Sequence, residues 1–244
     1  MKDRDQHRHH RGFTVLEAMV AILVMTVIAG AVFQQIDYAQ QRANAEQNKL
    51  DIFQETRDFM DQMTRDLHQA GYPNLHNFAP GQLTNGANDS RTGVGLVNIN
   101  YNELWFEGDV DGTGVVSSVQ YHLDTTGNGC PCLRRSQIPK VNGNPYTGQS
   151  AAAFQTEVQN VLNGTSASPI FYAYDTYNNP VTLPVDFNTN AATMATISTI
   201  KVVLTAQSPY ADLKTGQRPS VTLASTVRIN NCSQAAAGQT MSCQ

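Results

Sequence analysis

Residues 13–33 read FTVLEAMVAILVMTVIAGAVF, an apolar stretch in which Glu17 is the single charged residue. At a rise of 1.5 Å per residue, a helix of this length is roughly 30 Å long, which matches the hydrocarbon core of a bilayer. Residues 1–12 carry four Lys or Arg side chains against two Asp side chains. Because positive charge stays on the cytoplasmic side, the stretch predicts one membrane-spanning helix with the rest of the chain outside the cytoplasm.

Three interpretations of this segment compete. It has the features of a cleaved secretory signal, since Ala29-Gly30-Ala31 fits the A-x-A pattern. It also fits a plain anchor that is never cut. Neither accounts for Glu17, because a carboxylate inside a spanning helix costs roughly 2.5–3.5 kcal/mol unless it finds a partner. A third interpretation therefore has to supply Glu17 with a cation.

Residues 11–17, which read RGFTVLE, resemble the processing site of type IV prepilins and of type II secretion pseudopilins. The resemblance implies that a prepilin peptidase cuts between Gly12 and Phe13 and methylates the new amine of Phe13. It also implies that Glu17 pairs with the N-terminal amine of a neighbouring subunit during assembly. Such a pair is physically reasonable, since opposite charges in a low dielectric gain most when both would otherwise be buried alone.

The helical pattern continues beyond the apolar segment. No proline interrupts it until Gly71-Tyr72-Pro73, a glycine stop followed by a residue that cannot continue a helix. We therefore expect one helix over residues 13–70, roughly 85 Å long. The expected buried face carries apolar residues spaced three and four apart: Leu50, Phe53, Met60, Met63, Leu67 and Ala70. The ending RDLHQAGY, residues 65–72, resembles PilW-type minor pilins and the related J-type minor pseudopilins.

The remainder of the chain alternates short apolar runs with turn signals, which indicates an antiparallel sheet. The predicted class is α+β, a pilin-like fold in which a long N-terminal helix packs on a β-rich domain. One helical insertion is expected between a Ser150 cap and a Gly164 stop. Strands are expected at residues 94–99, 103–107, 115–123, 132–135, 170–175, 197–206 and 221–229.

These elements predict four segments. Residues 1–12 form a cytoplasmic leader that is cleaved, and residues 13–33 form the transmembrane and assembly helix. Residues 34–71 continue that helix in the periplasm. Residues 72–244 form the β-rich globular domain.

All four cysteines follow the apolar segment. They include no C-x2-C pair of the kind zinc sites use, and an exported chain favours disulfides. A bridge between Cys130 and Cys132 would be strained by its short span, so we predict a bridge between Cys232 and Cys243. Free or interchain cysteines remain open alternatives.

Residues 109–114, DVDGTG, hold the most site-like pattern of the body. Asp109 and Asp111 precede a glycine as in a calcium loop, but Gln120 stands where an EF-hand needs an acid. The pair Asp111-Gly112 also supplies the positive φ of a hairpin turn. The pattern predicts a hairpin turn, with a calcium site as the alternative; no other cofactor is indicated.

Composition and motifs restrict the function. The net charge is −4, and because the leader carries +2 the remainder carries −6, with no Lys/Arg stripe. Nucleic acid binding is therefore not indicated. The chain has no hydrolase elbow, zinc-protease helix, P-loop or dinucleotide fingerprint, which argues against an enzyme.

The resemblance implies a minor pilin-like subunit that helps to assemble or prime a type IV pilus. Its partners would be other major and minor pilins, bound through the N-terminal helix, and the prepilin peptidase. It would cross the bacterial inner membrane once, with its C-terminal domain in the periplasm, and then enter the filament. The alternatives are a J-type minor pseudopilin of type II secretion and an adhesive, calcium-binding module released after Ala31.

Overall fold

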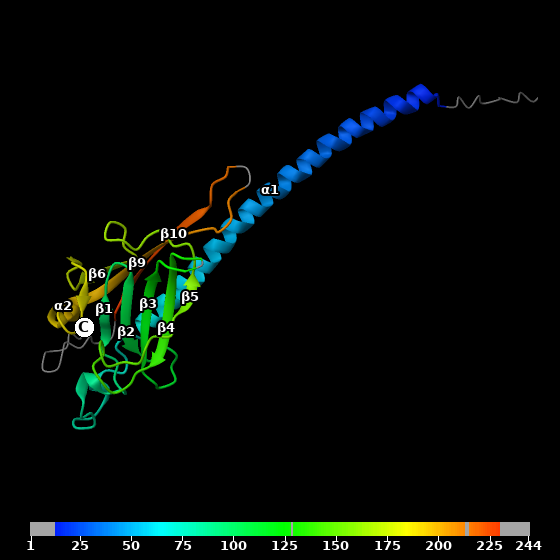
Figure 1. Ribbon diagram of the computed structural model, residues 1–244. Helices are drawn as coiled ribbons and strands as arrows, with labels where there is room; N and C mark the ends of the chain where they lie inside the picture. The colour runs from blue at the N-terminus through cyan, green and yellow to red at the C-terminus, as the bar shows by residue number, and fades with distance from the viewer. Residues whose placement is uncertain (1–12, 128, 213–214, 230–244) are drawn as a thin grey trace, which may run out of the picture.

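One long helix, α1 (Val15–His68), carries a β-rich body at its C-terminal end in the computed structural model, which describes residues 13–127, 129–212 and 215–229 (Figure 1). Thr14 caps the helix, since its hydroxyl oxygen accepts the backbone N–H of Glu17 at 3.3 Å. Gly71, at φ 80°, follows the helix end and precedes Pro73. The predicted uninterrupted helix is confirmed, two residues shorter at each end.

The buried face of α1 begins later than the sequence pattern predicts. Leu50 and Phe53 are 52% and 38% exposed, so their assignment to the buried face is wrong. Ile52 is the first buried residue of α1. Before it, residues 210–212 cover the helix only in part, and Gln41, Ala45 and Asn48 are half-buried. The buried residues of α1 are Ile52, Thr56, Phe59, Met60, Met63, Asp66 and Leu67.

Two antiparallel sheets form the body. The larger sheet has the order β5-β4-β3-β2-β1-β8, and the smaller has the order β10-β9-β6-β7. The larger sheet contains β1 (Gly95–Ile99), β2 (Glu103–Gly108), β3 (Ser117–Asp124), β4 (Cys132–Pro139), β5 (Gln155–Val158) and β8 (Val185–Asp186). The smaller contains β6 (Phe171–Asp175), β7 (Pro180–Val181), β9 (Ile197–Gln207) and β10 (Ser220–Arg228). The 3-10 turns η1 (Leu75–Asn77) and η2 (Gly86–Asn88) and the short helix α2 (Ala191–Thr196) lie in the connections.

The α+β class is confirmed, and each of the seven predicted strands has a counterpart in the two sheets. Three strands that the sequence did not predict, β5, β7 and β8, have four residues or fewer. Short strands of this kind carry too few residues for an alternating pattern to stand out.

The predicted helical insertion between Ser150 and Gly164 is wrong. This segment contains β5, which pairs with β4 through Leu133 and Val158. Val158 is fully buried, whereas Leu162, which a helix would place on the same face four residues later, is 55% exposed. Pairing at the edge of the sheet outweighs a local helical pattern, as tertiary contacts often do.

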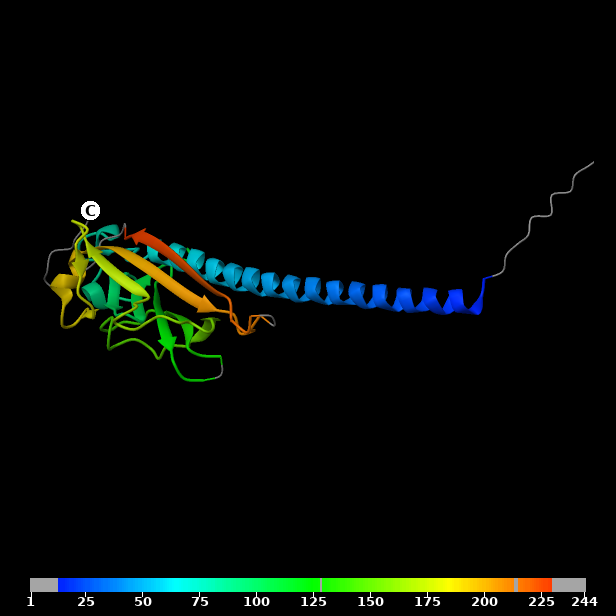
Figure 2. The ribbon, with the colours of Figure 1, turned by 90° about the horizontal axis from the view of Figure 1, so that it is seen from above.

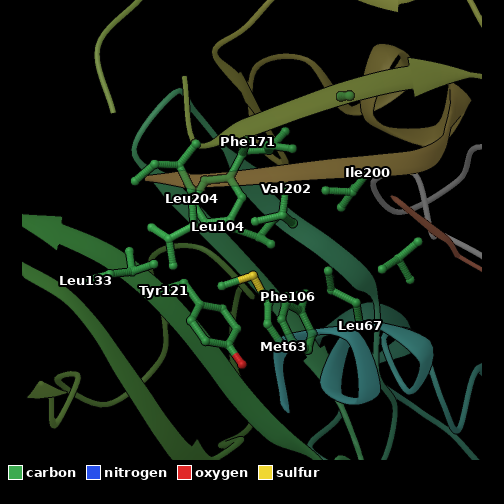
Figure 3. Packing of buried hydrophobic residues seen from close by; sticks show 14 of the residues in the cluster. Met63, Leu67, Leu104, Phe106, Tyr121, Leu133, Phe171, Ile200, Val202 and Leu204 are labelled. Carbon is green, nitrogen blue, oxygen red and sulfur yellow. The ribbon is translucent and has the colours of Figure 1, made fainter. Parts of the chain in front are cut away.

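The main core lies where α1 meets the two sheets (Figure 3). Met63 and Leu67 of α1 are 1% and 0% exposed, and they point toward Phe106 of the larger sheet. The smaller sheet closes the core with side chains such as Ile200 and Leu204. A second cluster lies apart from this core and contains Ala87, Val94, Val97, Trp105 and Phe187.

Candidate processing and assembly site

The predicted processing site lies at the start of α1, at the end of the molecule farthest from the body (Figure 2). Phe13 precedes the helix and is 82% exposed. Glu17 is the acidic residue of the first turn, where the positive end of the helix dipole favours a carboxylate. Gly12 lies outside the described residues.

The helix that follows has no intramolecular cover. Every residue from 15 to 33 is exposed, although nearly all of them are apolar. Among the described residues, α1 is the one helix long and apolar enough to cross a membrane, and none of its most apolar part is buried. An apolar surface of this length needs lipid or other helices around it.

Glu17 sits four residues after Phe13, about one helical turn. Its backbone N–H is satisfied by Thr14, but its carboxylate would lie within or at the edge of the apolar layer. A free amine on Phe13 would supply a cation at the same depth, on this chain or on a neighbour.

The second predicted site, residues 109–114, forms the turn between β2 and β3. The backbone N–H groups of Thr113 and Gly114 donate to the two carboxylate oxygens of Asp109 at 3.0 and 2.9 Å. Gly112 has φ 68°, as a tight turn requires. The predicted hairpin turn is confirmed, since β2 pairs with β3 on either side of it.

Asp111 completes this turn. Its Oδ1 accepts the Thr113 hydroxyl at 2.7 Å, and this hydrogen bond lowers the pKa of the Asp111 carboxyl. No group of three or more His, Cys, Asp or Glu side chains suited to a metal occurs within the described part of the chain. The calcium alternative stays a prediction.

The cysteine prediction needs a correction. Cys130 and Cys132 form a disulfide, with their Cα atoms 4.3 Å apart. The chain turns sharply at Pro131, which brings the two residues closer than an extended chain would. Cys232 and Cys243, for which we predicted a bridge, lie outside the described residues.

Two buried polar clusters of the body had no signal in the sequence, because their members lie far apart along the chain. In the first, Asp66 of α1 meets Tyr121 and Arg135 of the larger sheet. In the second, Nζ of Lys140 lies 2.7 Å from Oε2 of Glu107, and both side chains are fully buried. Burial raises the pKa of Glu107 to about 6, even beside the Lys140 ammonium.

The Lys140 ammonium also holds the loop between α1 and β1 against the larger sheet. It donates to the carbonyl oxygens of Ala87 and Thr92, each at 2.8 Å, in the segment between α1 and β1. The Val94 N–H lies 3.3 Å from the Glu107 carboxylate. These contacts hold a loop in position and bring no reacting groups together, so we assign them a structural role.

Comparison with known proteins gives one match. Residues 7–33 match the family model of the prokaryotic N-terminal methylation motif. A search of curated proteins and a search of solved structures each found no match. The matched residues include Gly12, Phe13 and Glu17, and they run to the end of the apolar stretch. The motif points to a structural subunit rather than an enzyme, and it supports a type IV pilin-family protein that carries a prepilin-type processing signal.

Proposed function

We propose that the chain is a minor pilin-like structural subunit that takes part in assembling or priming a type IV pilus. Prepilin peptidase cuts between Gly12 and Phe13, methylates the amine of Phe13 and leaves the apolar helix in place. The observation that carries the proposal is Glu17 in the first turn of an uncovered apolar helix that continues into the body without a break. A cut after Ala31 would leave the buried residues of α1, which begin at Ile52, in the body but would remove Glu17 and the apolar stretch, so the assembly role requires that this stretch be kept.

The proposal divides the chain into four segments. Residues 1–12 are the cytoplasmic leader, and residues 13–33 cross the inner membrane. Residues 34–71 continue the helix in the periplasm, and residues 72–244 form the periplasmic domain. After processing, the subunit leaves the membrane for the filament, where its helix packs against those of other major and minor pilins.

Mass spectrometry of the mature N-terminus tests the processing step. An N-methylated Phe13 is the expected result. A mature chain that starts at Val32 would instead mean a released module, and an intact Met1 would mean a plain anchor. Either outcome contradicts the proposal.

The assembly role of Glu17 has its own test. We expect Glu17→Ala to be cleaved normally but to enter filaments poorly, because the amine of its neighbour loses its counter-charge. Glu46→Ala is the matched control, since Glu46 is an exposed glutamate on the same helix beyond the apolar stretch. The measurement is the amount of each variant in sheared filaments relative to that in the membrane fraction. Equal incorporation of both variants would contradict the role of Glu17.

A J-type minor pseudopilin of type II secretion is the second candidate, because the RDLHQAGY ending resembles both groups. The two candidates differ in the subunits that co-purify with the chain. Recovery with type IV pilins supports the pilus, and recovery with pseudopilins supports the secretion system.

A further inference from the structure

The two sheets have four edge strands, and three of them are poorly suited to pair with another chain. β7 and β8 are two residues long, and β7 begins with Pro180. β5 has four residues, includes Glu157 and pairs with an irregular register. Short length, proline, charge and irregularity are the devices by which natural sheets protect their edges.

The fourth edge, β10, is the least protected, because its one charged residue, Arg228, is the last residue of the strand. It is nine residues long and pairs with β9 without a shift in register. Residues 220–227, SVTLASTV, contain no proline and no charge. Figure 2 shows β10, in red, at the margin of the smaller sheet and beside α1.

The direction of the backbone groups of β10 follows from β9. The N–H of Val203 donates to the carbonyl of Ile170 at 2.8 Å, so the backbone groups of Val203 point away from β10. Directions alternate along an antiparallel ladder, and Val203 lies opposite Ala224. The N–H and C=O groups of Ala224 therefore point outward from the sheet.

The same alternation holds two residues away on either side, at Thr222 and Thr226, opposite Thr205 and Lys201. The N–H of Ile229 donates to Ser198 of β9 at 2.8 Å, which fits an inward direction for the odd-numbered residues. Within the described residues, no hydrogen bond is made to the outward backbone groups of residues 222, 224 and 226.

A partly exposed apolar strip borders this edge. Phe53 is three helical turns from Thr64 and so lies on the same face of α1. The Thr64 hydroxyl lies 3.2 Å from that of Ser225 in β10. Phe53 remains 38% exposed, and Val221 and Leu223 of β10 are only partly buried. A strand added at this edge would both fill the backbone ladder and cover these side chains.

We propose that the open edge of β10 receives an extended, uncharged strand from another pilin-class subunit, by β-strand addition. The choice of partner rests on the proposed function. β10 packs against α1 itself, through Ser225 and Thr64. Under the proposed function, α1 is the helix along which pilin-class subunits associate, so a neighbour that lies along α1 also lies beside β10. The neutral edge favours a strand without charges over the polar tail of an unrelated protein.

A symmetric pair of identical chains does not fit. Antiparallel pairing of β10 with a second β10 places a two-fold axis between the strands and reverses the direction of the second α1. Two chains anchored through α1 in the same membrane run in the same direction. The added strand is therefore a segment other than β10 of a neighbouring pilin-class subunit.

Hydrogen exchange of single backbone amides tests the edge. The wild-type full chain is compared in lipid nanodiscs and in filaments sheared from the cells that make them. In nanodiscs, we expect the amides of Ala224 and Thr226 to exchange at least about tenfold faster than those of Leu223 and Ser225. In filaments, the difference should vanish. Fast exchange at Ala224 in filaments overturns the inference, and so does slow exchange in nanodiscs, because the chain would then cover its own edge.

Two variants at one position give an independent readout. Ala224→Pro removes an outward N–H, which an edge strand tolerates, while Ala224→Thr keeps it and is the matched control. We expect the proline variant to keep its thermal midpoint within about 3 °C but to enter filaments at least about tenfold less than the threonine variant. Equal incorporation overturns the edge inference alone if Glu17→Ala still fails to enter. Absence of the wild-type chain from filaments overturns the proposed function and, with it, the partner named here.

Discussion

Oδ2 of Asp66, in the last turns of α1, accepts the hydroxyl hydrogen of Tyr121 in β3 at 2.6 Å. The same oxygen lies 2.7 Å from Nη2 of Arg135 in β4. One buried carboxylate thus joins the helix to two neighbouring strands. The Tyr121 ring also meets Phe59 edge-on, with the ring centroids 5.7 Å apart, so the polar contact sits next to the main core. Burial raises the pKa of Tyr121 well above its usual value, which keeps its hydroxyl a donor.

Asp66→Asn should destabilise the body by about 2 to 4 kcal/mol, because Arg135 keeps its charge in a site that is nearly closed to water. Unfolding of the full chain by urea in detergent micelles, followed by the fluorescence of the single tryptophan, Trp105, measures the change. Asp61→Asn is the control, since Asp61 pairs with Arg57 at an exposed site and should change stability by less than about 0.5 kcal/mol. Equal effects of the two substitutions would refute the proposed role of Asp66.

Gly108→Ala should also destabilise the body, for a steric reason. A Cβ at Gly108 would collide with the backbone carbonyl of Gln69, at the point where β2 reaches the end of α1. Backbone atoms cannot move aside as a flexible side chain can, so a loss of about 1 to 3 kcal/mol is expected. Gly30→Ala is the same change on the exposed part of α1 with nothing within 4 Å, and it should favour the helix. The urea midpoint of Gly108→Ala should therefore fall, whereas that of Gly30→Ala should stay unchanged, because residue 30 packs on no part of the body.

Lys140→Met should cost about 3 to 5 kcal/mol at pH 7, because it leaves the Glu107 carboxylate buried without its cation. The loss should shrink near pH 4.5, where Glu107 can take up a proton. The double variant Glu107→Gln, Lys140→Met should recover most of the stability, since a neutral pair no longer carries a desolvation penalty. Urea unfolding at both pH values measures all three chains, and a loss that does not depend on pH would contradict this account.

The pH dependence of the stability of the wild-type chain should show that the pKa of Glu107 is raised in the folded state. The pKa of Glu107 is raised from 4.5 to about 6 in the folded state, so the folded state binds more protons in this interval. The stability that Glu107 contributes is complete below about pH 4.5 and is lost as the pH rises through about 6. Glu107→Gln should flatten this part of the pH profile. A profile of the same shape in the variant would assign the dependence to other groups.

Local signals in the sequence were sufficient for the helix, and the segment in which they predict the processing site matches the N-terminal methylation motif. The apolar run, Glu17 and the Gly71 stop act over a few residues, so their structural consequence could be read from the chain itself. The short apolar runs likewise placed the long strands. Of these, β9 and β10 alternate in burial, whereas β1 and β2 are buried on both faces. The β2–β3 turn was predictable because Asp111-Gly112 contains its own turn chemistry.

The missed features depend on contacts between distant residues. The helical pattern around Val158 was overridden by pairing with β4. Phe53 stays 38% exposed although its neighbour Ile52 is buried, because the packing of the two sheets decides which side of the helix is covered. The partners Asp66 and Arg135, or Glu107 and Lys140, are brought together only by the packing of helix and sheet. The sequence argued against a Cys130–Cys132 bridge because only one residue separates the two cysteines. The sharp turn at Pro131, which brings their Cα atoms to 4.3 Å, could not be seen from that spacing.

A substitution at Asp109 tests whether its carboxylate only stabilises the β2–β3 turn or also binds calcium. Asp109→Ala removes the acceptor of two backbone N–H groups and should cost about 1 to 2 kcal/mol without any added metal. Asp58→Ala, at an exposed position of α1, is the control and should have almost no effect. Because both carboxylate oxygens of Asp109 are already engaged in the turn, we expect the thermal midpoint of the full chain to be the same with and without calcium. A midpoint that rises with calcium in the wild type but not in Asp109→Ala would instead establish the calcium site.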